Sequence, residues 1–226
     1  MKGALVNFAA IIAGSMLGLI LKRGIPETYK ETIMHGLGLA VMVIGFKMAL
    51  VTENILIVIV SIALGAFIGE VMGIDAILNR IGVLLTEKLG TRYGDVGKGF
   101  VTATLIFCIG AMAIVGSIQE GLTGDASTLY AKSIIDGIAA IIFTAAMGIG
   151  VAFAAVPVFL YQAAITVGAS FFGEVISKAA INELTAVGGV LIIAISFAML
   201  EIKKIRVANL LPAVPIAVLL VILEIL

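Results

Sequence analysis

Long apolar runs recur along almost the whole chain, and they limit its fold more than any other feature. A helix needs about 20 apolar residues to cross the roughly 30 Å hydrocarbon core of a bilayer. Backbone polar groups at that depth must be satisfied within the segment, so such runs form helices. We therefore predict an all-α, polytopic transmembrane helix bundle of about eight spans. The eight runs are Gly3–Leu21, Ile33–Val51, Asn54–Gly73, Gly99–Ile118, Ile134–Ala154, Val156–Phe172, Thr185–Ile202 and Ala208–Ile225.

The border between the fifth and sixth runs is the least sharply marked. From 137 to 173 no charged residue interrupts the apolar sequence, and only Gly148, Gly150 and Pro157 punctuate it. Two readings are open: two short spans joined by a buried turn, or one helix broken at mid-membrane. The pattern favours two spans.

Composition excludes several classes of protein. Apolar residues make up 62% of the chain and charged residues only 12%, about half of what a soluble domain carries. The net charge is zero, so we expect no nucleic-acid partner. One cysteine, Cys108, and one histidine, His35, leave no basis for a disulfide or a Ser-His mechanism. We expect no enzyme activity, no catalytic residue, no metal site and no cofactor.

Basic residues indicate how the spans are oriented. Ten lysines and arginines fall in the first, third and seventh connections, against four on the other side. Cytoplasmic loops carry the excess of basic residues, so these odd-numbered connections are predicted to be cytoplasmic and both termini outside. The first run follows Lys2 but contains Asn7 and lacks a clean cleavage site, which favours a retained helix over a signal peptide.

The third connection, within 74–98, carries its own helical pattern. Six apolar residues between Ile77 and Leu89 fall on one helical face, and Asp75 stands where an N-cap is expected. This pattern predicts a helix lying on the cytoplasmic surface of the membrane. A plain connector without a functional role is the alternative.

An internal repeat is suggested by matches in common order. Ala9 to Gly14 recurs at Ala163 to Gly168, Glu31 and Gly36 at Glu183 and Gly188, Asn54 at Asn209, and Glu70 at Glu224. Within a single membrane domain, 1–226, spans one to three (1–73) would match spans six to eight (156–226). The segment 99–155 would then form a central helix pair. A shift of five spans inverts one copy, which is the recurring plan of secondary transporters. Chance similarity among Gly-, Ala- and Leu-rich helices is the alternative.

Polar residues within hydrocarbon must face a partner or a cavity, so they mark candidate pathway residues. The densest group lies at the ends of spans four and five: Ser117, Gln119, Glu120, Lys132 and Asp136. Lys132 and Asp136 are four residues apart, so on a helix they share a face and can pair. A gate or coupling-ion site is one reading, and an interfacial ion pair at a helix start is the other.

Three amides complete the candidate pathway. When Ala9 is aligned with Ala163, Asn7 falls one residue from Gln162, so the two could meet near a pseudo-twofold axis. Hydrogen bonding between helices without a ligand is the alternative. Asn209 opens the last span, where two prolines free backbone carbonyls.

Glycines at helical spacing predict close helix packing, with a homodimer as a further expectation. These residues are Gly14, Gly18, Gly65, Gly69, Gly73, Gly110 and Gly116.

Six segments together resemble the bacterial family labelled domain of unknown function 554. They are Gly3–Asn7, Gly65–Glu70, Phe107–Ser117, Lys132–Gly137, Val158–Gln162 and Val207–Ala213. Ala163 departs from the glycine expected after Gln162. The resemblance covers essentially the whole chain and implies a multi-pass protein of the inner (cytoplasmic) membrane. It implies no activity or substrate.

The function that these patterns favour is secondary transport of a small solute or ion across the lipid bilayer. No Walker loop is present, so this chain does not hydrolyse ATP through such a loop. A channel, which needs a continuous polar stripe, and a structural or assembly protein are the alternatives.

Overall fold

The computed structural model describes residues 1–22, 27–90, 95–169 and 177–223, and these residues are mostly helical. The elements in chain order are α1 (Lys2–Lys22), α2 (Glu27–Ala49), α3 (Ile55–Met72), α4 (Ile74–Leu89), α5 (Val96–Cys108), α6 (Ala111–Thr123), α7 (Ser127–Met147), α8 (Gly150–Phe153), α9 (Ala155–Gly168), α10 (Lys178–Met199), the 3-10 helix η4 (Val207–Leu210) and α11 (Ala213–Ile222). The all-α class predicted from the sequence is confirmed.

Six segments are long and apolar enough to cross a membrane: α1, α2, α3, α7, α10 and the stretch Gly150–Gly168. The predicted fourth span corresponds to α5 and α6, which are bent by 58° and would make a seventh. The predicted eighth span corresponds to the shorter apolar stretch Val207–Ile222. The exact number of eight is therefore not confirmed. Glu224 and the ends of the sixth and eighth predicted spans, Phe172 and Ile225, lie outside the described residues.

The fifth and sixth spans are two helices. Helix α7 ends at Met147, and Gly148 follows with a φ of +95°, a conformation that side-chain-bearing residues rarely adopt. The Gly148 N–H donates to the Thr144 carbonyl at 2.8 Å and closes the last turn. The chain then re-enters helical structure at Gly150 as a separate candidate span.

The helices group into two compact units, neither of which is continuous in sequence. Unit 1 comprises Met1–Ile33, Leu78–Cys108 and Met112–Phe171, and unit 2 comprises Met34–Ile77, Ile109–Ala111 and Phe172–Leu226. Unit 1 therefore holds α1, most of α4, α5, α6 from Met112, and α7 to α9. Unit 2 holds most of α2 together with α3, α10, η4 and α11.

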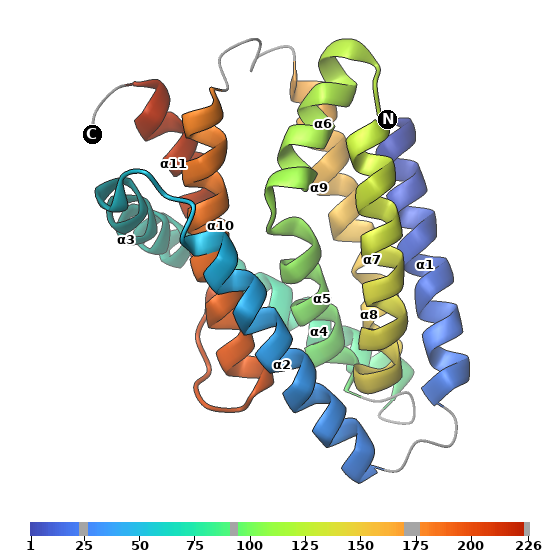
Figure 1. The fold of residues 1–226 in the computed structure, drawn as a ribbon. Helices are drawn as coiled ribbons and strands as arrows, with labels where there is room; N and C mark the ends of the chain where they lie inside the picture. Colours follow the sequence, from blue (N-terminus) through green and yellow to red (C-terminus); the bar gives the residue numbers. More distant parts are fainter. Residues whose placement is uncertain (23–26, 91–94, 170–176, 224–226) are drawn as a thin grey trace. The chain divides into compact units, whose positions relative to one another are not determined.

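Within unit 1, α1 and α7 lie side by side and run in the same direction (Figure 1). Small residues let their backbones approach closely. A Cβ added at Gly14 would lie 2.2 Å from the Gly137 carbonyl oxygen, and one at Gly18 would lie 2.4 Å from that of Ile141. In this register the Asn7 side chain of α1 reaches Asp136 in the third turn of α7.

Within unit 2, helices from opposite ends of the chain run antiparallel. A Cβ added at Gly69 of α3 would lie 1.9 Å from the Asn209 carbonyl oxygen, and one at Gly65 would lie 2.4 Å from the Ala213 nitrogen. Helices α2 and α10 approach in the same way, since a Cβ at Gly189 would lie 2.6 Å from the Gly45 carbonyl oxygen.

The helix predicted in the third connection is present as α4. It begins at Ile74, so Asp75 lies in its first turn and not at the N-cap; that detail of the prediction is wrong. The Asp75 backbone N–H instead donates to the Asn209 side chain at 2.7 Å. On the predicted apolar face, Ile77, Ile81 and Leu84 are exposed and the other three residues are half-buried.

Candidate functional site

A charged cluster is buried in unit 1 between α1 and α7. The ammonium group of Lys132 pairs with Asp136 one turn along α7, and each side chain is 7% exposed. The Asn7 amide of α1 donates to the same carboxylate oxygen, Asp136 Oδ2, at 2.9 Å. The Lys132 nitrogen also lies 6.0 Å from the ring centroid of Phe107 on α5. Three helices thus hold one buried ion pair.

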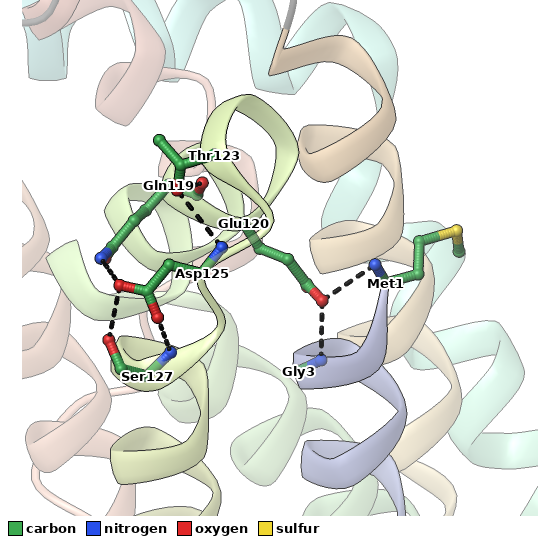
Figure 2. Close-up of polar contacts among 7 residues, drawn as sticks. All are labelled: Met1, Gly3, Gln119, Glu120, Thr123, Asp125 and Ser127. Carbon is green, nitrogen blue, oxygen red and sulfur yellow. Dashed lines mark hydrogen bonds and ion pairs between the residues drawn. The ribbon is translucent and has the colours of Figure 1, made fainter.

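Glu120 of α6 contacts the start of α1, about one turn before Asn7. Its Oε1 accepts a hydrogen bond of 3.0 Å from the Gly3 N–H and lies 2.9 Å from the Met1 amino group (Figure 2). A Cβ added at Gly3 would lie 2.6 Å from Leu129, so α1, α6 and α7 meet in this layer. The carboxylate of Glu120 therefore joins the start of α1 to the end of α6.

The turn between α6 and α7 lies at the surface beyond this layer. Asp125 accepts hydrogen bonds from the Ser127 backbone N–H at 2.9 Å and from the Gln119 amide at 2.7 Å (Figure 2). The bonds from Ser127, backbone first and then hydroxyl, together with that from Gln119, lower the pKa of Asp125 below its ordinary value. Gln119 also accepts from the Thr128 hydroxyl at 2.7 Å, so its amide serves this turn.

Two more predicted residues, Ser117 of α6 and Gln162 of α9, lie at a common depth in unit 1. A Cβ added at Gly121 would touch the Thr166 carbonyl oxygen at 2.3 Å, which places these residues of α6 and α9 at one depth. Ser117 and Gln162 each precede their contact residue by four positions, or about 6 Å along a helix. Helices α6 and α9 run in the same direction in Figure 1, so both residues move to the same depth. We name Asn7, Ser117, Lys132, Asp136 and Gln162 the buried polar layer.

Several atoms of this layer have no hydrogen-bond partner among the described residues. They are Asn7 Oδ1, Ser117 Oγ and both amide atoms of Gln162, and the three side chains are fully buried. Further unpartnered buried oxygens in unit 1 belong to Ser15, Thr104, Glu120, Thr144 and Thr166. Buried polar groups are nearly always hydrogen-bonded, so a concentration of exceptions marks a place where another molecule can bind.

Helix packing alone does not account for the buried ion pair. A buried ion pair contributes little net stability, because desolvation of both charges offsets their attraction. Apolar side chains of similar volume would hold the helices at least as well. Retention of the pair in a span therefore favours a functional role for it.

Asn209 lies in unit 2, apart from the other predicted pathway residues. Its amide donates to Glu70 Oε2 at 2.6 Å, and its oxygen accepts from the Asp75 N–H. Glu70 also pairs with Arg206, and both side chains of that pair are more than half exposed. In this unit Asn209 and Glu70 join η4 to the junction of α3 and α4.

Sequence reasoning did not select Glu183 as a site residue, although it is the most heavily bonded carboxylate of unit 2. It is 2% exposed and accepts hydrogen bonds from the Thr52 hydroxyl at 2.7 Å and from the N–H groups of Glu53 and Asn54 at 2.7 and 3.1 Å. From α10 it therefore holds the turn that leads into α3, whose N-cap is Asn54. A carboxylate within a mostly apolar stretch of sequence could have marked Glu183 as a candidate.

The predicted packing glycines have different surroundings. Gly14, Gly18, Gly65 and Gly69 meet backbone atoms of a neighbouring helix, and Gly116 meets Leu129. Gly73 ends α3 with a φ of +63°, and Gly110 lies in the break between α5 and α6; a Cβ at either would meet nothing within 4 Å. A homodimer through these faces stays a prediction.

The long apolar helices and the buried polar layer together define a polytopic helical membrane protein. Comparison with known protein families identifies its family. Residues 2–222 match the family described as "Protein of unknown function (DUF554)", and the chain belongs to this family. The resemblance inferred from the sequence is thereby confirmed.

Two relatives align over nearly their full length. The chain is 34% identical over 219 residues to "Uncharacterized membrane protein YdfK" of Bacillus subtilis (strain 168), covering 94% of this chain and 92% of the relative. It is 28% identical over 220 residues to "Uncharacterized protein YqgA" of Escherichia coli (strain K12), covering 95% and 94%. No solved structure matches the chain.

Proposed function

We propose that this protein is a secondary transporter of a small solute or ion and that the buried polar layer is its binding site. The observation that carries the proposal is the Lys132–Asp136 pair, held by Asn7 inside helices of membrane-spanning length. Ionisable residues at such positions mark substrate or ion pathways more often than they mark packing.

An inverted-topology repeat, with 1–73 matching 156–226, is part of the proposal. The directions of the matched helices support it. A twofold axis lying in the membrane plane sets each helix antiparallel to its copy. In unit 1, α1 and α9 run antiparallel, with Phe8 and Phe159 in edge-to-face contact at 5.9 Å between ring centroids. In unit 2, α2 runs antiparallel to α10, and α3 runs antiparallel to η4 and α11.

The break in the fourth span also fits this function. Transporters commonly place discontinuous helices at their sites, because a helix break frees backbone groups for a ligand. Here α5 ends at Cys108, α6 begins at Ala111, and Phe107 beside the break faces Lys132. The last turn of α5 before the break therefore adjoins the ion pair.

Cysteine accessibility tests the proposal without knowledge of the substrate. In a Cys108→Ala background, Ser117→Cys and Thr144→Cys introduce thiols at buried positions nearer the two ends of unit 1. Membrane-impermeant maleimide is then applied to each face of oriented vesicles. Alternating access predicts that Ser117→Cys reacts from one face and Thr144→Cys from the other, each slowly. Ile138→Cys, whose side chain is 55% exposed on α7, is the lipid-facing control and should stay unreactive.

Other outcomes separate the alternatives. If neither Ser117→Cys nor Thr144→Cys reacts from any face, the protein is a closed structural bundle and the proposal is wrong. If both react from both faces at the rate of a free thiol, the pathway is a continuous pore and the protein is a channel. An Asp136→Asn variant should alter the balance between the two faces if the ion pair controls access.

A further inference from the structure

Gln162 of α9 is the least explained polar group in the described part of the chain. It has no exposed surface, and neither amide atom has a hydrogen-bond partner there. A primary amide offers two donors and one acceptor with two lone pairs. Burial of all of them unpaired carries the full cost of removing them from water. A bound molecule that both donates and accepts would remove that cost.

The second glutamine of the chain behaves in the ordinary way. Gln119 donates to Asp125 and accepts from Thr128, both at 2.7 Å. Its amide is thus satisfied at both ends even though its position is only partly buried. This contrast sets Gln162 apart from a packing residue of the same type.

Unpartnered atoms from two other helices lie near the depth of Gln162. On α1, Phe8 follows Asn7 and contacts Phe159 of α9, three residues before Gln162. Asn7 donates its Nδ2 to Asp136, which leaves Oδ1 as a free acceptor. Ser117 on α6 and Gln162 on α9 each precede the contact of Gly121 with Thr166 by one turn. A lone buried hydroxyl can turn toward a carbonyl of its own helix, so Ser117 alone would mean little. The unpartnered amide atoms of Gln162 and Asn7 cannot be explained in that way.

The charges around this position favour a ligand without ionised groups. Lys132 and Asp136 neutralise each other, and Glu120 one turn away is paired with the Met1 amino group. An ion brought here would be attracted by one member of the Lys132–Asp136 pair and repelled by the other, so no unpaired charge offsets the cost of removing the ion from water. A molecule without ionised groups avoids that cost and can use the free amide and hydroxyl atoms.

We propose that Gln162, with Asn7 and Ser117, binds a small polar molecule without ionised groups, of the amide or polyol class, and that this molecule is the transported solute. This inference rests on the proposed transport function and specifies its substrate class.

The first arm of the test needs no ligand. Gln162→Leu removes an unsatisfied buried amide and should raise the melting temperature of the purified protein. Gln119→Leu removes the hydrogen bonds that Gln119 makes at the α6–α7 turn, so it should lower the melting temperature or leave it unchanged. Cys108 is the single cysteine and is buried, so a thiol-reactive dye reports unfolding in both variants. A lower melting temperature for Gln162→Leu would mean that the amide has partners, and it would overturn the proposal.

The second arm measures binding with named probes. Acetamide, D-glucose, myo-inositol and uridine are added at millimolar concentration, beside sodium chloride, sodium phosphate and glycine as charged or zwitterionic controls. At least one uncharged probe should raise the melting temperature of the wild type and of Gln119→Leu but not of Gln162→Leu. A shift only with a charged or zwitterionic control, an equal shift in Gln162→Leu, or no shift with any uncharged probe overturns the proposal. None of these outcomes bears on maleimide access to Ser117→Cys and Thr144→Cys, so transport itself can stand when this inference fails.

Discussion

Separating the two charges of the buried pair should cost far more than removing both. Lys132→Met leaves Asp136 buried without its cation, and Asp136→Leu leaves Lys132 without its anion; each side chain is 7% exposed. Loss of one partner of a buried pair typically costs about 3–5 kcal/mol of the free energy of unfolding. The double variant buries no charge, and its principal loss is the hydrogen bond from Asn7, worth about 1 kcal/mol. The double variant should therefore be more stable than either single variant.

The coupling free energy between the two positions should exceed about 3 kcal/mol in a double-mutant cycle. The pair between Arg206 and Glu70 is the matched control, because its side chains are 67% and 51% exposed. Arg206→Met and Glu70→Gln should each change stability by about 0–1 kcal/mol, with a coupling in the same range.

Reversible unfolding in mixed detergent micelles, with helix content followed by circular dichroism as the denaturing detergent is increased, measures all of these values. The reasoning is refuted if the Lys132→Met/Asp136→Leu double variant is no more stable than its weaker single variant. It is equally refuted if the coupling matches that of the exposed control, because the pair would then be solvated.

Four further results are expected. Gly14→Ala should lower the free energy of unfolding by about 1–3 kcal/mol, because its Cβ would meet a backbone carbonyl at 2.2 Å. A Cβ at Gly36 meets nothing within 4 Å, so Gly36→Ala should leave the free energy of unfolding unchanged or raise it by up to about 1 kcal/mol. Equal effects of the two substitutions would contradict the packing of α1 on α7. Glu183→Gln should destabilise the turn before α3 by about 1.5–3 kcal/mol and speed hydrogen exchange of the Glu53 and Asn54 amides. Unchanged exchange would argue against these bonds. In a carbon-13 NMR titration, the pKa of Asp125 should lie below the ordinary aspartate pKa. The stability that Asp125 contributes is therefore present above the ordinary pKa and is lost as pH falls through the lowered pKa. A midpoint at or above the ordinary pKa would show that the hydrogen bonds from the α6–α7 turn are absent. A cysteine placed at Glu87 in a cysteine-free background should react with impermeant maleimide from the cytoplasmic face, and labelling from outside intact cells would reverse the predicted orientation.

Much of the candidate site could be predicted from the residues because polar groups are rare in this sequence. Asn7, Lys132, Asp136 and Gln162 stand out against apolar runs, and the spacing of four between Lys132 and Asp136 already places them on one helical face. All four are buried in unit 1 as the pathway interpretation requires. The hydroxyls of Thr104 and Thr144 were not selected, since a hydroxyl in a helix can bond to its own backbone and gives no distinct signal.

Which polar residues meet could not be predicted in the same way. Asn209 is as conspicuous as Asn7, yet it bonds to Glu70 in unit 2. Gln119 is as polar as Gln162, but the turn at Gly124 directs it to Asp125. Such choices depend on which helices adjoin, and periodicity within one helix carries no information about its neighbours.

Local chemistry in the sequence determined the helical class, the membrane environment, most of the span positions and the candidate polar residues. These features follow from hydropathy, helical period and the cost of burying polar groups, all of which act within one segment. Only the tertiary structure decided that α1 packs on α7, across more than a hundred residues, and that Glu183 holds the turn before α3. The physical reason is that close helix packing depends on complementary surfaces, and Gly14 against Gly137 is a match that neither helix specifies alone.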